Sequence, residues 1–150
     1  MQHEMIRTGG ITVNDKWKMM SLCMDQWMKL REQKATIMTY FEERSIHSVG
    51  VYGYGILGRH FVWEAEQFGG AVGIAWILDR RADIIATAPH PMYQPEAVET
   101  LSEPDLIVVC AISDFEEIEA FVSARLRIPV VSLKTIIEEC NWKAQMGTTV

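Results

Sequence analysis

Short, strongly apolar runs alternate along the chain with segments in which apolar residues recur every three or four positions. Apolar runs of this length are typical of buried strands in a parallel sheet, whereas a spacing of three and four is typical of an amphipathic helix. The runs that predict strands are 49–52, 71–78, 84–86, 106–112 and 128–133. The segments that predict helices are 14–43, 58–68, 96–101, 114–125 and 134–142.

Strands that alternate with helices imply a parallel sheet with helices on both faces. Because crossover connections are right-handed, we expect a doubly wound α/β sheet of about five strands in the order 3-2-1-4-5. Asn14 or Asp15 can cap an extra N-terminal helix, which can break near Thr36. The predicted divisions are a flexible arm at 1–13, a helical segment at 14–44, the sheet domain at 45–142 and a frayed tail at 143–150.

Three glycines follow the first predicted strand with the spacing G-x-G-x-x-G. Gly53 allows a tight turn out of the strand, and Gly55 has no Cβ, so that a pyrophosphate can approach the backbone. Gly58 lets the following helix pack close to the strand. The N-terminus of that helix presents free N–H groups and a partial positive charge, and the motif therefore predicts a phosphate site.

An acidic residue, Asp79, ends the second predicted strand about 20 residues beyond the last glycine, where a ribose-binding carboxylate belongs. Arg80 and Arg81 follow it, and an arginine here can hold a 2′-phosphate, although a facing carboxylate would repel that phosphate. The order of strand, glycine turn, helix, strand and Asp79 indicates a Rossmann-like nucleotide-binding domain. The expected ligand is NAD, NADP or a nucleotide-sugar, with NAD favoured. The alternative is a glycine-rich turn that holds no ligand.

The strand order reverses between the first and fourth strands, and ligands bind at such a switch point. The residues that we expect to hold the ligand are Gly53, Tyr54, Gly55, Ile56, Leu57, Gly58, Asp79, Arg80 and Ser113. Ser113 has a second interpretation, because with Glu116 it can form a capping box for the next helix. Tyr54 can cover a ligand or block the pocket, and His90 lies in a proline-rich loop from which it could act as an acid or base.

The chain has 150 residues and a net charge of −6, which does not favour nucleic-acid binding. Its apolar runs are shorter than the ~20 residues that span a bilayer, and its first residues do not read as a signal peptide. The three cysteines are widely separated, which suits a reducing cytoplasm better than a disulfide framework. The four histidines do not cluster with cysteines at the spacing of metal ligands, so we expect no metal site.

The predicted N-terminal helix carries an apolar stripe at steps of three and four residues, formed by Trp17, Met20, Met24 and Trp27. One interpretation is that the stripe packs against the domain's own sheet or helices. The other is a homodimer in which this helix meets its symmetry mate, because Met and Trp are enriched at such interfaces and twofold contacts are common.

The stretch from Trp27 to about Cys140 resembles a Rossmann-like family found in bacterial surface-polysaccharide gene sets. The motifs that carry the resemblance are V-Y-G-Y-G-I-L-G at 51–58, I-L-D-R at 77–80, Val108-Val109 with Phe115 and Ile118, and P-V-V-S-L at 129–133. The chain is also similar to the nucleotide-sugar-binding domain of sialic-acid-type acyltransferases and to NAD(P)-binding halves of polysaccharide epimerases. The resemblance implies nucleotide or nucleotide-sugar binding in envelope carbohydrate metabolism, and it supplies no catalytic residues.

Three functions follow from these patterns. The first is a cytoplasmic, single-domain nucleotide-binding protein, accessory or regulatory in polysaccharide biosynthesis. The second is an oxidoreductase or epimerase subunit that acts on a nucleotide-sugar, with His90 or Tyr54 in the chemistry. The third is a structural interaction module that has lost its ligand. Short-chain dehydrogenases use a Tyr-x-x-x-Lys pair, which is absent from the sequence, and a Ser–His–Asp set is also absent.

Overall fold

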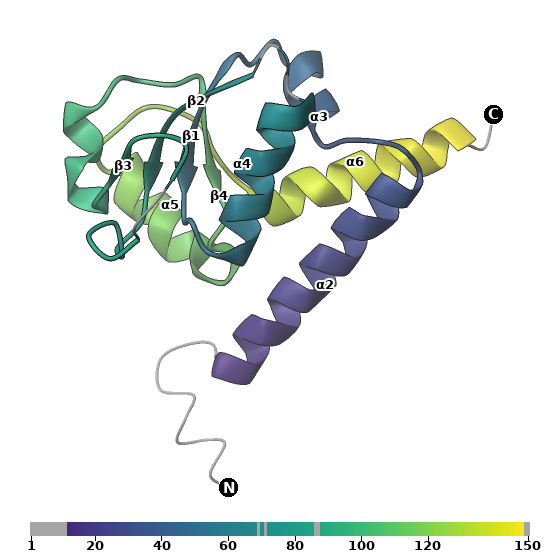
Figure 1. Cartoon of the computed structure of the whole chain (residues 1–150), viewed down its shortest axis with the longest axis horizontal. Coiled ribbons are helices and arrows are strands. Elements are labelled where there is room, and N and C mark those ends of the chain that lie inside the picture. Colours follow the sequence, from purple (N-terminus) through teal and green to yellow (C-terminus); the bar gives the residue numbers. More distant parts are fainter. Residues whose placement is uncertain (1–11, 69, 71, 86–87, 149–150) are drawn as a thin grey trace, which may run out of the picture.

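A single parallel sheet organises the computed structural model, which describes residues 12–68, 70, 72–85 and 88–148. Its five strands lie in the order β3-β2-β1-β4-β5, and all four pairings are parallel. The strands are β1 (Ser48–Tyr52), β2 (Gly73–Leu78), β3 (Met92–Tyr93), β4 (Leu106–Val109) and β5 (Val130–Ser132). The order 3-2-1-4-5 and the α/β class are thus confirmed (Figure 1).

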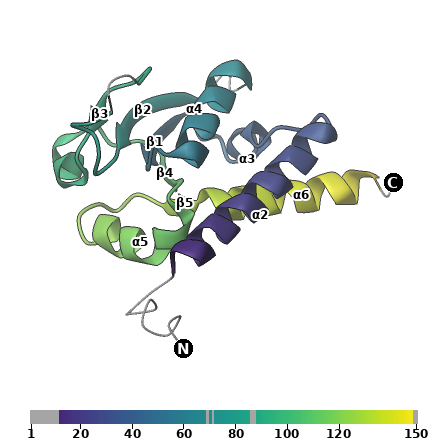
Figure 2. The ribbon, with the colours of Figure 1, turned by 60° about the horizontal axis from the view of Figure 1, so that its bottom comes forward.

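Helices cover both faces of the sheet (Figures 1 and 2). The α-helices are α2 (Val13–Glu32), α3 (Met38–Glu43), α4 (Ile56–Phe68), α5 (Phe115–Ser123) and α6 (Leu133–Thr148), and two 3-10 helices are η1 (Pro95–Thr100) and η2 (Ile112–Asp114). Side chains alternate across β1, so that Val49 and Val51 face the core shared with α2, α3, α4 and α6. Tyr52 faces the second core, which contains residues of η1 and α5.

The third strand is not where the sequence predicted it. The run 84–86 was predicted as a strand, but Ile84 lies in a turn and is 80% exposed. The edge strand is instead Met92–Tyr93, inside the segment predicted as a loop because of its prolines. The Pro91 carbonyl accepts a hydrogen bond from the Ile77 N–H at 2.9 Å. Proline is tolerated here because the pairing uses this carbonyl and needs no N–H donor from Pro91.

The N-terminal helix begins at Val13, slightly earlier than expected, because its cap is Thr12 and neither Asn14 nor Asp15. The Thr12 hydroxyl accepts from the Asp15 N–H, and the Asp15 carboxylate accepts from the Thr12 N–H, so Asp15 completes a capping box. The helix ends at Glu32, and Lys34 follows with a φ of 61°. The predicted break near Thr36 therefore falls between α2 and α3. Most of the predicted arm, residues 1–11, lies outside the described residues.

A buried carboxylate, Glu64 of α4, fixes α2 and α3 to the sheet domain. Only 2% of Glu64 is exposed, and it accepts four hydrogen bonds. Two come from α2, where the Trp27 indole donates at 3.1 Å and the Arg31 guanidinium at 2.8 Å. The other two come from the Thr36 hydroxyl at 2.7 Å and the Ile37 N–H at 3.0 Å. The first interpretation of the stripe is thus correct for Trp27, which packs within its own chain.

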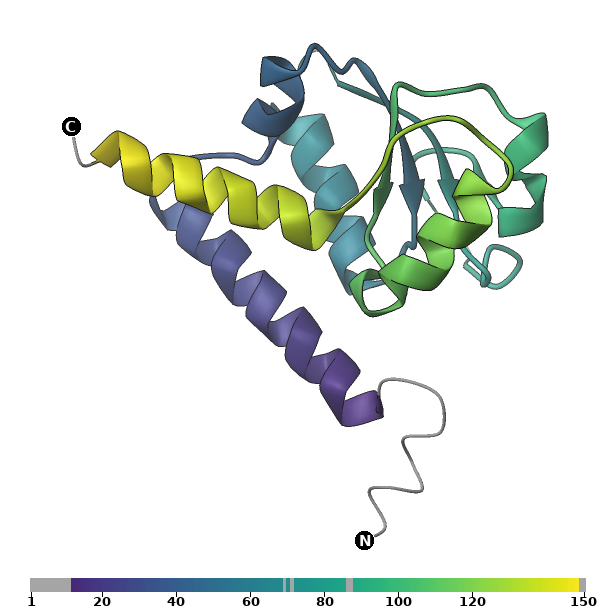
Figure 3. The same ribbon diagram turned by 180° about the vertical axis from the view of Figure 1, so that it is seen from behind.

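The last helix, α6, extends to Thr148, although the sequence predicted a frayed tail from 143. It crosses α2, and Figures 1 and 3 show the two helices together on one side of the sheet. The Asn141 amide donates to the Gln26 carbonyl at 2.9 Å, and Lys143 pairs with Glu43 of α3. These contacts tie the middle of α6 to α2 and α3. Within the described ranges, the helices lack the combination of length and apolar character needed to cross a bilayer.

Candidate functional site

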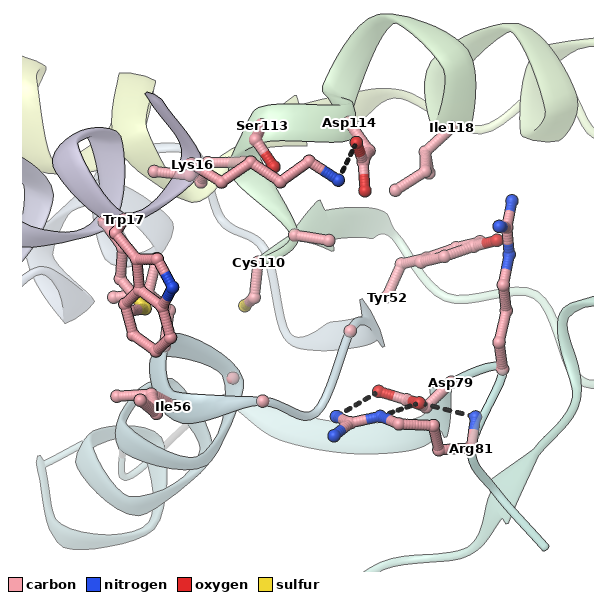
Figure 4. Close-up of a pocket in the computed structure, with 18 of the residues that line it drawn as sticks. Lys16, Trp17, Tyr52, Ile56, Asp79, Arg81, Cys110, Ser113, Asp114 and Ile118 are labelled. Atoms are coloured by element: carbon pink, nitrogen blue, oxygen red, sulfur yellow. Dashed lines mark hydrogen bonds and ion pairs between the residues drawn. The ribbon is translucent and has the colours of Figure 1, made fainter. Parts of the chain in front are cut away.

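A cavity of about 450 Å³ lies at the carboxyl ends of β1 and β4, at the switch point that the strand order predicts. Four segments of the chain line it (Figure 4): the glycine turn, the end of β2, the connection from β4 to α5, and the first turns of α2. Of the nine predicted site residues, eight line this cavity: Gly53, Gly55, Ile56, Leu57, Gly58, Asp79, Arg80 and Ser113. The structure therefore brings these eight residues together around one cavity.

Two of the three motif glycines are required by the fold itself. Gly53 has a φ of 102°, a conformation that side chains disfavour, and its N–H donates to the Leu78 carbonyl at 2.7 Å. A Cβ on Gly58 would lie 2.0 Å from the Gly53 carbonyl oxygen, so a side chain would force α4 away from β1. These two glycines explain how α4 begins so close to the strand.

Gly55 differs from the other two. A Cβ built on it would face the cavity, and among the described residues it would meet only the Arg81 guanidinium, at 3.8 Å, which is an ordinary contact. The fold therefore tolerates a side chain at this position. What the absent side chain provides is free space beside the first turn of α4, where N–H groups lack intrahelical partners and the helix dipole is positive.

Asp79 is buried at the end of β2 and accepts hydrogen bonds on both carboxylate oxygens. Oδ2 accepts from the Tyr54 N–H at 2.7 Å and from Arg81 Nη2 at 3.4 Å. Oδ1 accepts from the Arg81 N–H at 2.7 Å and from Arg81 Nε at 3.2 Å. Burial alone would raise the pKa of Asp79, but the hydrogen bonds from Arg81 and Tyr54 outweigh it and hold the pKa below its usual value. The carboxylate is ionised at neutral pH.

Arg80 lies on the other side of the same turn, close to the phenol of Tyr52 and 3.5 Å from the Glu117 carboxylate. Burial raises the pKa of Tyr52, and the neighbouring Arg80 opposes this effect only in part. Tyr52 therefore stays a neutral donor or acceptor in the cavity wall. At the high pH at which arginine titrates, attraction to the ionised Tyr52 phenol and the hydrogen bond with Glu117 raise the pKa of Arg80, which therefore stays charged at neutral pH.

Ser113 does not cap the helix that follows, which corrects the capping-box interpretation. Residues Ile112–Asp114 form η2, and neither η2 nor α5 has a side-chain cap at its start. The chain enters α5 through this tight turn, which leaves Ser113 on the cavity wall. Asp114 is paired with Lys16 of α2 at 3.5 Å between charged atoms.

The first turns of α2 form the part of the cavity wall that sequence reasoning missed. Val13, Lys16, Trp17 and Met20 all line it, and 55% of Trp17 is exposed. In Figure 4 the Trp17 indole lies beside Ile56, across the cavity from Tyr52. The spacing of the stripe identified these residues as an apolar face, and tertiary contacts, among them the Glu64 network and the pair of Lys16 with Asp114, bring that face to the glycine turn.

Two candidate residues do not reach the cavity. The Tyr54 side chain packs against the core on the α4 side of the sheet, and only its N–H serves the site, through Asp79. His90 Nε2 lies 2.9 Å from the Glu66 carboxylate, on the outer side of α4, and among the described residues it is outside the cavity lining. The arrangement gives neither of them access to a ligand held at the glycine turn.

The cysteine nearest the site is Cys110, which follows β4 and lines the cavity, although only 4% of it is exposed. Burial raises the pKa of its thiol far above the usual value, so it is protonated and a poor nucleophile. Cys23 and Cys140 are also buried free thiols. Among the residues that the structure describes, His, Cys, Asp and Glu form no group of three or more that could hold a metal ion.

No protein-family model matches the chain, and a comparison with curated proteins finds no match either. The kind of ligand that the site can bind is therefore inferred from its geometry. It combines a helix N-terminus, free space over Gly55, cationic side chains at the end of β2 and an apolar wall that includes an exposed indole. Such a site can bind an anionic group at one end and a ring at the other, as nucleotides present them.

Proposed function

We propose that the protein binds the diphosphate-containing part of a nucleotide, as found in NAD, NADP and nucleotide-sugars, in the cavity at the glycine turn. The observation that supports this most strongly is the contrast among the three glycines. Packing explains Gly53 and Gly58, but it does not explain Gly55, whose missing side chain leaves open space at the N-terminus of α4. A close approach of a phosphate to the backbone accounts for that space.

The proposed role is that of a binding or regulatory subunit in the cytoplasm. Support for an accessory role comes from the cavity itself, because His90 and Tyr54, the two candidates for acid–base chemistry, point elsewhere. Three buried free thiols suit a reducing compartment. The place in bacterial polysaccharide biosynthesis rests on the resemblance of the sequence motifs, and it is proposed on that basis.

Thermal unfolding in the presence of nucleotides tests the proposal. A ligand that binds the native state raises the unfolding midpoint with increasing concentration. The panel is NAD, NADP, UDP, UDP-sugars and nucleoside monophosphates, and we expect a shift with at least one diphosphate. The Gly55→Val variant should fold and lose the shift, because the valine side chain would fill the phosphate space. Gly73→Val is the matched control, since among the described residues its Cβ would meet only the His47 carbonyl, at 3.7 Å and at the opposite end of the sheet.

Two results would contradict the proposal. One is the absence of a shift with every panel member at millimolar concentration, which would favour the purely structural module. The other is a shift that survives in Gly55→Val, which would show that the ligand does not use the space over the glycine turn.

We also propose that the protein forms a homodimer through the outer side of α2. Trp27 is excluded from that interface because it is buried in its own chain. The large apolar side chains that α2 leaves exposed are Val13, Trp17, Leu22 and Met28. Sedimentation velocity should give the mass of a dimer, and Leu22→Asp or Met28→Asp should convert it to a monomer. A monomer for the wild type would contradict this proposal and leave the nucleotide site unaffected.

A further inference from the structure

The carboxylate that should bind ribose is already fully engaged. A carboxylate offers about four acceptor positions. Asp79 uses them for the Tyr54 N–H, the Arg81 N–H and two N–H groups of the Arg81 guanidinium. The pair is one unit in which the negative charge of Asp79 is matched by Arg81. A ribose hydroxyl could reach Asp79 only by displacing one of these donors.

The Arg81 guanidinium lies at the place where a phosphate would approach the glycine turn. Its Nη2 atom is the atom nearest to a Cβ built on Gly55, at 3.8 Å, and Figure 4 shows its side chain alongside Asp79 and extending toward the turn. A guanidinium carries five N–H donors. Two of them point to Asp79, so three remain for another acceptor.

We propose that Arg81, held in place by Asp79, binds a phosphate of the ligand over Gly55, and that Asp79 is a positioning residue for Arg81 and not the ribose ligand. This inference rests on the proposed nucleotide-binding function and names the group that the site recognises. A planar guanidinium fixed by a carboxylate is well suited to a phosphate, because it offers two parallel N–H donors in a preset orientation. The pairing also removes the repulsion that a bare carboxylate would exert on that phosphate.

Calorimetric titration with ADP tests the role of Arg81. Arg81→Gln should weaken ADP binding by about tenfold to a hundredfold, since hydrogen bonds to charged groups are worth about 1.5–3 kcal/mol and each 1.4 kcal/mol is a factor of ten. Arg81→Lys should lie between this variant and the wild type, because it keeps the charge and loses the fork. Arg125→Gln is the control with the same change of charge, at an exposed side chain just beyond the end of α5, where it pairs with Glu99 of η1. Equal Kd values for wild type and Arg81→Gln would overturn the inference.

Titration with 2′-deoxy-ADP tests the role of Asp79 without changing the protein. If Asp79 only positions Arg81, the wild type should bind ADP and 2′-deoxy-ADP with similar Kd values. If Asp79 accepts from the ribose 2′-hydroxyl, the deoxy compound should bind about tenfold more weakly, since about 1.4 kcal/mol is a factor of ten. That second result would overturn the inference while leaving nucleotide binding intact. Failure of wild type to bind ADP or any other diphosphate would instead overturn the proposed function, and the inference with it.

A double substitution separates positioning from general structural damage. Asp79→Asn should weaken ADP binding in the wild-type background, because Arg81 loses its partner. In the Arg81→Gln background the same change should have little further effect, because the group that Asp79 positions is already gone. Equal weakening of ADP binding in both backgrounds would indicate that Asp79 only stabilises the fold, and this would contradict its role in positioning Arg81.

Discussion

Replacing Glu64 with alanine removes the acceptor that holds α2 over the cavity. Four donors lose their partner, and two of them, the Trp27 indole N–H and the Ile37 N–H, belong to buried residues. Thr36 and Arg31 are partly exposed, so water can replace the lost carboxylate there. The damage should therefore come mainly from the two buried donors.

The expected loss can be worked from these contacts. A buried donor left without a partner costs about 1–3 kcal/mol, so the two buried donors together account for a loss of about 2–6 kcal/mol. We expect Glu64→Ala to lower the free energy of unfolding by about 3–5 kcal/mol. Because a domain has only about 5–15 kcal/mol in total, this is a large part of the stability. Glu64→Gln keeps one acceptor and should cost about half as much.

Urea denaturation, followed by circular dichroism, measures the effect. Glu66→Ala is the matched control, because Glu66 is two residues along the same helix and 41% of its side chain is exposed beside His90. Its loss should be below about 1 kcal/mol, as for other exposed ion pairs. Similar free energies of unfolding for Glu64→Ala, Glu66→Ala and wild type would refute the idea that Glu64 holds the N-terminal helix to the domain.

Three further predictions follow from the site and its surroundings. Gly58→Ala should destabilise the protein by about 1–3 kcal/mol in urea, because its Cβ would lie 2.0 Å from a carbonyl oxygen, whereas Gly55→Ala should be nearly neutral. Because the folded pKa of Asp79 lies below the usual 3.8, its ionised form stabilises the protein above that pH. This stabilisation should fade as the pH falls through the folded pKa, so the free energies of unfolding of wild type and Asp79→Asn, measured in urea, should converge there. A constant difference between them down to pH 2 would argue against this prediction. The buried thiols should react slowly with a thiol reagent at neutral pH and all together in denaturant. The reason is that burial raises the pKa of Cys23 to about 11 and raises that of Cys110 further. Rapid reaction of the native protein would contradict this prediction.

The sequence was sufficient for the parts of the fold that depend on local pattern. The glycine spacing, the buried β4 run and Asp79 at the end of β2 each carry their own signal, and the sheet order follows from the alternation of elements. The position of β3 has no such signal. A two-residue edge strand beside Pro91 pairs mainly through backbone contacts with β2, and Ile84 offers a more apolar but misleading alternative.

The cavity wall from α2 could not be predicted, because it depends on contacts between distant residues. The stripe indicated that Trp17 and Met20 lie on one helical face, but it did not indicate what the face covers. Glu64 looks like an ordinary charged residue on an amphipathic helix, and only the tertiary structure shows it buried and bonded to Trp27 and Arg31. The local order of Asp79 and Arg81 likewise does not reveal that they form a bonded pair.

Backbone amide resonances give the most direct test of nucleotide binding at the glycine turn. Two-dimensional ¹H–¹⁵N spectra recorded during an ADP titration should show the largest shifts at Gly55, Ile56 and Leu57, with a shift of the Arg81 Nε–H resonance. The same titration of Gly55→Val should leave these signals in place. Shifts concentrated elsewhere, for example along α6, or spectra unchanged at millimolar ADP and UDP, would contradict the account.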